Sequence, residues 1–232
     1  MSLANRYTSS NMVYRRPDLY DYLASNDDSL TAAVHQLTAD TGLGSALDLG
    51  CGTGRHLAAL HADFGCKAVG VDVQPGLIDH GRVTYPELEL VLGDIRSVRL
   101  DRQFDIVLCL GNSLSYQLTD ADLQATVGTF AAHTRAGGYV LISTLLQPAL
   151  GSGTGQIENE FLAAEVETAS SWDADSRIVT TERTWRHRDG SVDKDVMRRR
   201  VTPIEELSSL LSSAGFTDAA VLDGGLVAAR PR

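Results

Sequence analysis

The sequence is poor in lysine, cysteine and long apolar runs. Only two of its basic residues are lysines, Lys67 and Lys194. The three cysteines, Cys51, Cys66 and Cys109, form no CxxC pair, so neither a zinc site nor a disulfide framework is indicated. No apolar run reaches the length that spans a bilayer, and the N-terminal segment lacks the apolar core of a signal peptide. We therefore expect a cytoplasmic protein without a membrane partner.

Positive charge is also in deficit. The chain has 20 Lys and Arg residues against 30 Asp and Glu residues, which gives a formal net charge of −10. A nucleic acid would have to be held by a local basic patch against this repulsive field, so we expect no nucleic-acid partner. The length of 232 residues and the 43% hydrophobic content are typical of one globular domain that acts on a small molecule.

Short apolar segments alternate with amphipathic segments between Ser45 and Leu146. Continuous apolar strands separated by helical spacers are typical of a parallel sheet that helices cover on both faces. This pattern predicts a doubly wound α/β core over residues 45–150. Residues 1–44 are expected to form helices that lead into the first strand.

The sequence texture changes after Leu146. The segment GSGTGQ predicts a flexible loop at Gly151–Gly155, and strands are expected from Phe161, Arg177 and Val192. An Asp-Gly step at residues 189–190 predicts a hairpin turn. We expect an antiparallel insert over residues 151–202. Residues 203–232 should then return to the core as a helix and two strands.

The densest motif is the segment DLGCGTG, which runs from Asp48 to Gly54 between a predicted strand and a predicted helix. Glycines at this place let a ligand approach the backbone closely. Asp72 ends the next strand about twenty residues later, where a carboxylate can accept both hydroxyls of a ribose. The pair indicates an adenosine-type ligand. The alternative is a structural turn followed by a solvated loop acid.

Nicotinamide-dependent enzymes are a rival interpretation of this motif. Their usual fingerprint is GxGxxG, whereas here the third glycine comes one residue early. Short-chain dehydrogenases also need a lysine four residues after a tyrosine, but the positions four residues before Lys67 and Lys194 are Asp63 and Gly190. The residues of that chemistry are therefore absent.

Together with Gly93-Asp94-Ile95 after the third strand, these motifs closely resemble class I S-adenosylmethionine-dependent methyltransferases. The resemblance implies a Rossmann-like, mostly parallel sheet of seven strands, with the antiparallel insert after the fifth strand. It also implies S-adenosylmethionine as the cofactor. The cofactor-binding residues that it implies, with Cys51 as a packing residue of the loop, are Asp48, Gly50, Cys51, Gly52, Asp72, Val73, Asp94, Ile95 and Leu110. From its local sequence alone, Asp94 would be interpreted as a helix cap or a turn acid.

The segment CLGNSLSY, which ends at Tyr116, follows the fourth strand, where this family faces its methyl acceptor. It lacks the Pro-Pro-aromatic and Pro-Cys signatures of methyltransferases that act on nucleic-acid bases. It is similar to glycine N-methyltransferases and bacterial nucleotide-sugar N,N-dimethyltransferases, which usually have His at the position of Tyr116. The resemblance implies that Asn112 and Tyr116 bind the acceptor and that Tyr116 is catalytic.

Two further segments resemble the aminosugar enzymes. The insert, with Trp185 and the strand that carries Arg198 and Arg200, resembles a substrate lid, and its arginines could bind an acidic acceptor. The alternative is a solvated edge strand. The N-terminal Tyr14 and Tyr20 resemble tyrosines of the segment that closes over the cofactor, which makes Tyr14 a second catalytic candidate. The alternative here is packing of an amphipathic helix.

These observations predict an S-adenosylmethionine-dependent methyltransferase of a small molecule. The expected acceptor is an amine nitrogen of an aminosugar or antibiotic-type metabolite of secondary metabolism. Oxygen or carbon methylation is the first alternative, and a non-catalytic S-adenosylmethionine-binding module is the second. The six histidines show no metal-ligand spacing, so no metal is expected. The insert strands would permit a homodimer.

Overall fold

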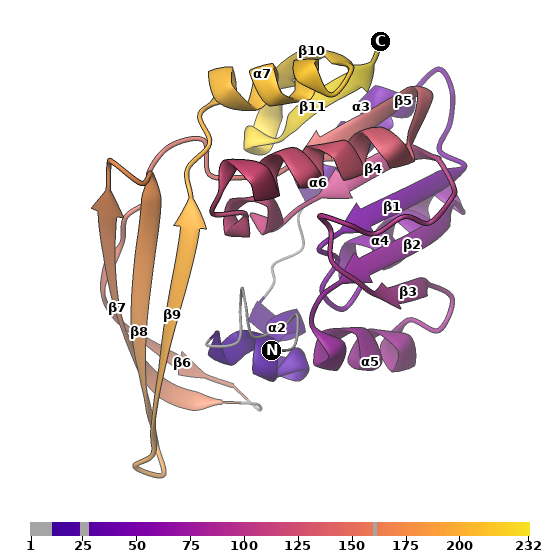
Figure 1. The fold of residues 1–232 in the computed structure, drawn as a ribbon. Coiled ribbons are helices and arrows are strands. Elements are labelled where there is room, and N and C mark those ends of the chain that lie inside the picture. The colour runs from indigo at the N-terminus through magenta and orange to yellow at the C-terminus, as the bar shows by residue number, and fades with distance from the viewer. Residues whose placement is uncertain (1–10, 24–27, 160–161) are drawn as a thin grey trace.

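The computed structural model describes residues 11–23, 28–159 and 162–232 (Figure 1). Its larger sheet has the strand order β10-β11-β5-β4-β1-β2-β3. The strands are β1 (Ser45–Leu49), β2 (Lys67–Asp72), β3 (Glu89–Leu92), β4 (Phe104–Cys109), β5 (Thr134–Ile142), β10 (Phe216–Val221) and β11 (Val227–Pro231). Strand β11 runs antiparallel to both of its neighbours, and the other pairings are parallel. The predicted doubly wound fold is confirmed.

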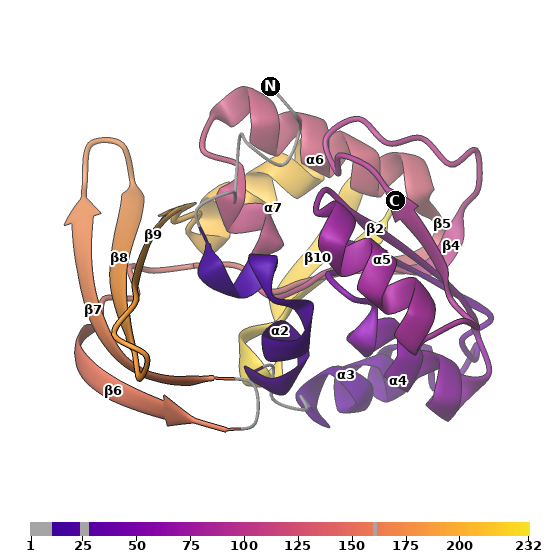
Figure 2. The same cartoon turned by 90° about the horizontal axis from the view of Figure 1, so that it is seen from below.

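Helices cover both faces of this sheet (Figures 1 and 2). Helices α3 (Asp28–Thr38), α4 (Arg55–Phe64) and α5 (Pro75–Thr84) pack on one face, and α6 (Asp120–His133) and α7 (Ile204–Ser213) pack on the other. Successive strand residues alternate between the faces, so Ala46 belongs to one core and Leu47 to the other. This explains why the strands read as unbroken apolar runs. No helix among the described residues is long and apolar enough to cross a membrane.

A smaller antiparallel sheet stands beside the core, in the order β6-β7-β8-β9. Its strands are β6 (Ser152–Glu158), β7 (Ala163–Asp173), β8 (Ile178–His187) and β9 (Val192–Arg200). The predicted loop at Gly151–Gly155 was wrong, because this segment pairs with β7 from Ser152 opposite Ala169 onward. As an exposed edge strand it has no apolar alternation to reveal it. Phe161, the expected start of the next strand, lies outside the described residues.

The N-terminal segment lies between the smaller sheet and the core (Figures 1 and 2). It consists of the short helix η1 (Met12–Arg15) and helix α2 (Pro17–Leu23). Met12 and Leu19 form a third apolar cluster with Val166 and Trp185 of the smaller sheet. The N-terminal segment is therefore packed against the smaller sheet, and this packing orients it relative to the core.

Helix α5 presses on the glycine-rich loop, and this contact generates a stability prediction. A Cβ atom at Gly81 would overlap the carbonyl oxygen of Thr53. We expect Gly81→Ala to lower the free energy of unfolding by about 1–3 kcal/mol, the usual cost of overpacking. Gly128 in α6 has nothing within 4 Å of such a Cβ. Gly128→Ala should therefore raise stability by about 0.5–1 kcal/mol. Urea unfolding of both variants and of wild type measures these changes. If Gly81→Ala were as stable as wild type, the tight contact would be contradicted.

Candidate active site

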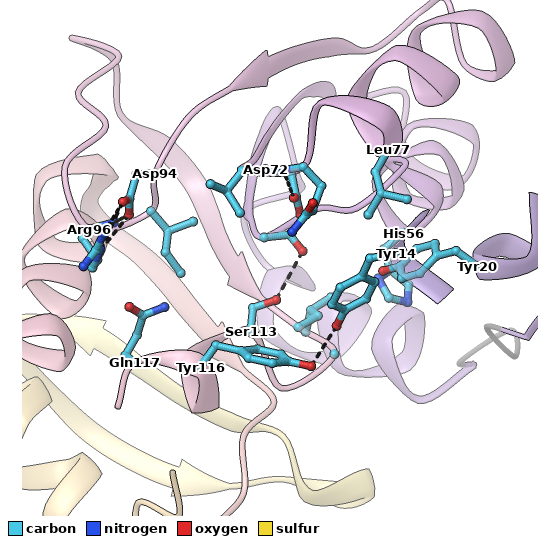
Figure 3. Close-up of a pocket in the computed structure, with 16 residues that line it drawn as sticks. Tyr14, Tyr20, His56, Asp72, Leu77, Asp94, Arg96, Ser113, Tyr116 and Gln117 are labelled. Atoms are coloured by element: carbon cyan, nitrogen blue, oxygen red, sulfur yellow. Dashed lines mark hydrogen bonds and ion pairs between the residues drawn. The ribbon is translucent and has the colours of Figure 1, made fainter. Parts of the chain in front are cut away.

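The carboxyl ends of β1, β2, β3 and β4 surround one cavity (Figure 3). Strand order reverses at β1, so the loops after β1 and β4 diverge and leave a crevice there. The cavity encloses about 760 Å³, including space that is open to solvent. It is lined by Tyr14, Tyr20, Gly50, His56, Asp72, Val73, Gln74, Leu77, Asp94, Ile95, Arg96, Leu110, Gly111, Ser113, Tyr116 and Gln117. The lining combines apolar side chains with a few acidic and hydroxyl groups, which is typical of a ligand-binding site.

The glycine-rich loop needs its glycines for two reasons. Gly50 and Gly52 have φ angles of +93° and +60°, a region that residues with a side chain rarely adopt. A Cβ atom at Gly50 would overlap Ser113, and one at Gly52 would lie 2.5 Å from the Tyr20 hydroxyl. The loop therefore lies in direct contact with Ser113 and Tyr20, and Gly50 lines the cavity.

Asp72 is held in place by backbone donors at the end of β2. Its Oδ2 accepts a hydrogen bond from the Gly52 amide at 2.8 Å, and its Oδ1 accepts one from the Gln74 amide at 2.8 Å. Burial raises the pKa of Asp72, and these amide hydrogen bonds offset part of that rise. Each carboxylate oxygen keeps lone pairs for a further donor. The oriented pair of oxygens can accept two neighbouring hydroxyl groups.

Asp48 is fully buried beneath the loop, and neither of its carboxylate oxygens has a hydrogen-bond partner among the described residues. Burial, followed by the charge of Asp72, raises the pKa of Asp48 to about 7. A buried carboxylate without a partner is costly, and a nearby cation would lower that cost. A positively charged ligand in the neighbouring cavity would therefore favour the charged form of Asp48. S-adenosylmethionine, with a sulfonium and an ammonium group, has that charge.

Asp94 and Arg96 form an ion pair at another side of the cavity. The Arg96 guanidinium donates to both Asp94 oxygens at 2.5–3.1 Å and also to Asp122 at 2.5 Å. Asp94 also accepts a hydrogen bond from the Arg96 amide at 2.9 Å. The charge of Asp94 is therefore largely compensated within the protein itself.

Three tyrosines close the opposite end of the cavity. The hydroxyl oxygens of Tyr14 and Tyr116 are 3.1 Å apart, and the rings of Tyr14 and Tyr20 lie 5.8 Å apart. Burial is the main cause that raises the pKa of Tyr14 and of Tyr20 well above the usual tyrosine value. Both phenols therefore keep their protons at neutral pH. They can orient a ligand through hydrogen bonds but are poor bases.

A second hollow adjoins the first. Its lining residues are Asn11, Val13, Tyr14, Tyr20, Leu23, Arg55, His56, Leu110, Gly111, Ser143, Arg183 and Leu226. Five of them, Tyr14, Tyr20, His56, Leu110 and Gly111, also line the first cavity. The two hollows thus share a wall of aromatic and loop residues. A molecule in the second hollow would therefore lie beside a ligand in the first.

A buried carboxylate connects the smaller sheet to the tyrosines. Asp195 of β9 is 2% exposed and accepts hydrogen bonds from the Met12 amide at 2.8 Å and from Trp185 at 3.2 Å. Arg183 donates to both Asp195 oxygens at 2.7–2.8 Å and to Asn11 at 2.8 Å. Because η1 carries Tyr14, this network positions Tyr14 from the smaller sheet.

The structure brings most of the predicted site residues together. Tyr14, Tyr20, Gly50, Asp72, Val73, Asp94, Ile95, Leu110 and Tyr116 line the cavity. Asp48, Cys51 and Gly52 lie in or beneath the loop and are not among the lining residues. The predicted acceptor residues Asn112, Trp185, Arg198 and Arg200 line neither hollow.

Each of these four departures has a physical reason. Arg200 is 4% exposed and forms ion pairs with Asp120 at 2.6 Å and Glu206 at 2.8 Å, so the prediction of substrate binding was wrong. Arg198 is exposed, and strand alternation places it on the face opposite Asp195. Trp185 is buried in the third apolar cluster. Asn112 has a left-handed φ of +62° and forms the turn before η2 (Ser113–Tyr116).

Sequence reasoning missed several lining residues. They are His56, Gln74, Leu77, Arg96, Gly111, Ser113 and Gln117. Two of them could have been found, because Gln74 and Arg96 follow the predicted acids Asp72 and Asp94 by two residues. The loop after β4 was also predicted to belong to the site, but the 3₁₀ helix η2 determines which of its residues face the cavity.

Comparison with known proteins identifies relatives of this chain. Residues 46–138 match a family described as a methyltransferase domain. The chain is 35% identical over 122 residues to a dTDP-3-amino-3,4,6-trideoxy-alpha-D-glucopyranose N,N-dimethyltransferase of Streptomyces venezuelae, covering 53% of this chain and 50% of that relative. It is 33% identical over 132 residues to a malonyl-[acyl-carrier protein] O-methyltransferase of Yersinia pestis, covering 53% and 48%. The chain spans about half the length of these curated relatives.

Solved structures match over a larger share of the chain. A sugar N-methyltransferase from Streptoalloteichus superposes with a TM-score of 0.80 at 24% identity, covering 93% of this chain and 92% of that one. An S-adenosylmethionine-bound amino pentose methyltransferase from Micromonospora echinaspora gives a TM-score of 0.78 at 23% identity, covering 91% and 93%. These matches show that the chain has the same fold as these two methyltransferases.

The buried carboxylate under the loop predicts a pH-dependent effect on stability. The pKa of Asp48, raised to about 7, means that the folded state holds a proton that the unfolded chain releases near pH 4. The stability contributed by this proton is present at low pH and is lost as pH rises from about 4 to about 7. We expect Asp48→Asn, which does not titrate, to have a free energy of unfolding about 1–3 kcal/mol higher than that of wild type at pH 8. The two should converge near pH 4.

Asp105→Asn is a matched control with the opposite sign. Burial alone would raise the pKa of Asp105, but hydrogen bonds from Arg135 and Ser45 lower it overall. This carboxylate therefore stabilises the fold above its unfolded pKa, and its loss should destabilise the protein at neutral pH. Chemical unfolding from pH 4 to 8 measures all three proteins. Parallel curves for wild type and Asp48→Asn would show that Asp48 does not titrate in this range.

Proposed function

We propose that this chain is an S-adenosylmethionine-dependent methyltransferase that methylates an amine nitrogen of a small molecule; its fold and the methyltransferase domain matched over residues 46–138 support this. The observation that carries the proposal is the pair of hollows that meet at Tyr14. One has the glycine loop and acids that suit the cofactor. The other is an adjoining space for an acceptor.

The residues of the first cavity fit S-adenosylmethionine. The Asp72 oxygens would accept the ribose hydroxyls, and Gly50, which lines the cavity, would border the methionine part. The carboxyl group of Asp48 lies beneath this loop, and a net positive ligand in the cavity would favour its charged form. When bound, S-adenosylmethionine supplies a methyl group on a positively charged sulfur, so the chemistry needs no nucleophilic side chain.

The remaining task of the protein is to align the acceptor and exclude water. The acceptor would occupy the second hollow, with its nitrogen directed between Tyr14 and Tyr116. Both hydroxyls can accept a hydrogen bond from an amine, which orients its lone pair. Burial among aromatic rings also favours the neutral amine, which is the reactive form. The Asp195 network, which holds η1, would keep Tyr14 in place beside the acceptor.

An aminosugar is the acceptor class that the relatives support. Three curated relatives at 33–35% identity are named as N,N-dimethyltransferases of dTDP-linked aminosugars. We therefore propose an amino group on a sugar, in the biosynthesis of an antibiotic-type metabolite. The 33% identity to a malonyl-[acyl-carrier protein] O-methyltransferase makes a carboxylate oxygen the second candidate.

Binding and product analysis test the proposal together. Titration calorimetry should show binding of S-adenosylmethionine and S-adenosylhomocysteine without added metal. Asp72→Ala should weaken it by about 1.5–3 kcal/mol, the loss expected for hydrogen bonds to a charged group. Incubation with a panel of aminosugars and acyl carboxylates, followed by mass spectrometry, identifies the methylated atom. Binding without any methylated product would favour a non-catalytic binding module, and methylated carboxylates would favour the second candidate.

The tyrosine pair generates a kinetic prediction. Tyr116→Phe removes the hydroxyl that pairs with Tyr14 while it keeps the ring. We expect kcat and kcat/KM to fall together by about tenfold, the equivalent of one lost hydrogen bond in the transition state. Tyr139→Phe, outside the cavity lining, is the matched control and should keep wild-type kinetics. A kcat for Tyr116→Phe within about threefold of wild type from pH 6 to 9 would exclude a catalytic role.

A further inference from the structure

One acidic side chain ties helix α2 to the glycine-rich loop. The Oδ1 of Asp21 accepts a hydrogen bond from the Thr53 hydroxyl at 2.5 Å, and its Oδ2 lies 3.6 Å from Nε2 of His80 on α5. Thr53 is fully buried. Loss of Asp21 would therefore leave a buried hydroxyl without this partner, which is costly in free energy.

This contact lies directly beside the group that holds the proposed ribose acid. The amide of Gly52, which precedes Thr53 in the chain, donates to Oδ2 of Asp72 at 2.8 Å. On the other side of the loop, the Thr53 carbonyl oxygen lies against Gly81 of α5. The loop is thus held between α2 and α5. A shift of Thr53 would move Gly52 and, with it, a donor to Asp72.

The N-terminal segment that carries Asp21 also carries the tyrosines of the site. Tyr20 precedes Asp21, and its hydroxyl lies against the loop at Gly52. Tyr14 lies in η1, and its hydroxyl is 3.1 Å from that of Tyr116. Tyr14 and Tyr20 both line the cofactor cavity and the adjoining hollow. A contact that fixes this segment on the loop therefore also fixes the wall that the two hollows share.

We propose that Asp21 is a positioning residue that couples the cofactor cavity to the acceptor hollow. A ligand held by Asp72 favours the loop conformation in which Thr53 meets Asp21, and this contact keeps α2 and its tyrosines in place. Because such coupling is reciprocal, the docked segment also raises the affinity for the cofactor. The inference rests on the proposed use of S-adenosylmethionine.

Calorimetry and amide hydrogen exchange with S-adenosylhomocysteine test the coupling without any acceptor. In wild type, saturating S-adenosylhomocysteine should slow exchange in residues 12–23. Asp21→Ala should weaken binding about tenfold, the change expected for one lost hydrogen bond to a charged group. At saturating ligand, exchange in its residues 12–23 should stay as fast as in the free variant. A purely structural role of Asp21 would speed exchange in both states and leave the slowing by ligand intact.

Matched variants make the test specific. Asp18→Ala removes another carboxylate from α2, one that pairs with Arg16 at 2.8 Å, and should keep the wild-type affinity and protection. Thr53→Val removes the same hydrogen bond from the loop side and should reproduce Asp21→Ala, which also serves if Asp21→Ala does not fold. Thr53→Ser keeps the hydroxyl and should retain the protection. In the Thr53→Val background, Asp21→Ala should change the affinity by less than about twofold.

The outcomes separate this inference from the proposed function. Binding to wild type without slower exchange in residues 12–23 overturns the coupling and leaves the methyltransferase proposal intact. Unchanged affinity and protection in Asp21→Ala or Thr53→Val does the same. Failure of wild type to bind S-adenosylhomocysteine overturns both. Loss of protection in these two variants, with its retention in Asp18→Ala and Thr53→Ser, supports the role of Asp21.

Discussion

The hydrogen bond from the Gly52 amide to Asp72 is the contact on which the rest of the site depends. It joins the loop after β1 to the end of β2, and so connects the two motifs that are nearest to the ligand. Gly52 can make it because its positive φ turns the amide toward the carboxylate, with Tyr20 lying against the loop where a side chain would otherwise stand. The shape of the loop and the orientation of the proposed ribose acid are therefore set together.

The same arrangement buries two carboxyl groups at the loop, and no basic side chain among the described residues pairs with either of them. Asp48 and Asp72 are both buried, and burial raises the pKa of each carboxyl group. By contrast, Asp94 is compensated by Arg96, and Asp105 by Arg135. The cavity is thus electrostatically asymmetric. Its loop end suits a cation, and its Asp94 end suits a neutral, hydrogen-bonding base. A positively charged nucleoside such as S-adenosylmethionine meets both conditions.

Long-range contacts complete the site from the other side. The Met12 amide and Asp195 are 183 residues apart in the sequence, yet they are 2.8 Å apart in the structure. Through this bond the smaller sheet positions η1, and η1 brings Tyr14 to Tyr116. The acceptor space proposed here therefore depends on three parts of the chain at once. A change in the smaller sheet can reach the reacting groups without contacting either ligand.

The sequence by itself determined the core fold and the cofactor side of the site, because apolar strand periodicity and the glycine motif act over a few neighbouring residues. The exposed strand β6 was missed, since an edge strand with both faces in solvent carries no apolar alternation. Arg200 was misassigned, because its partners Asp120 and Glu206 come from other elements. Asp195 was missed for the same reason, because its partners Met12 and Arg183 come from other elements, and only tertiary packing decides which residues meet.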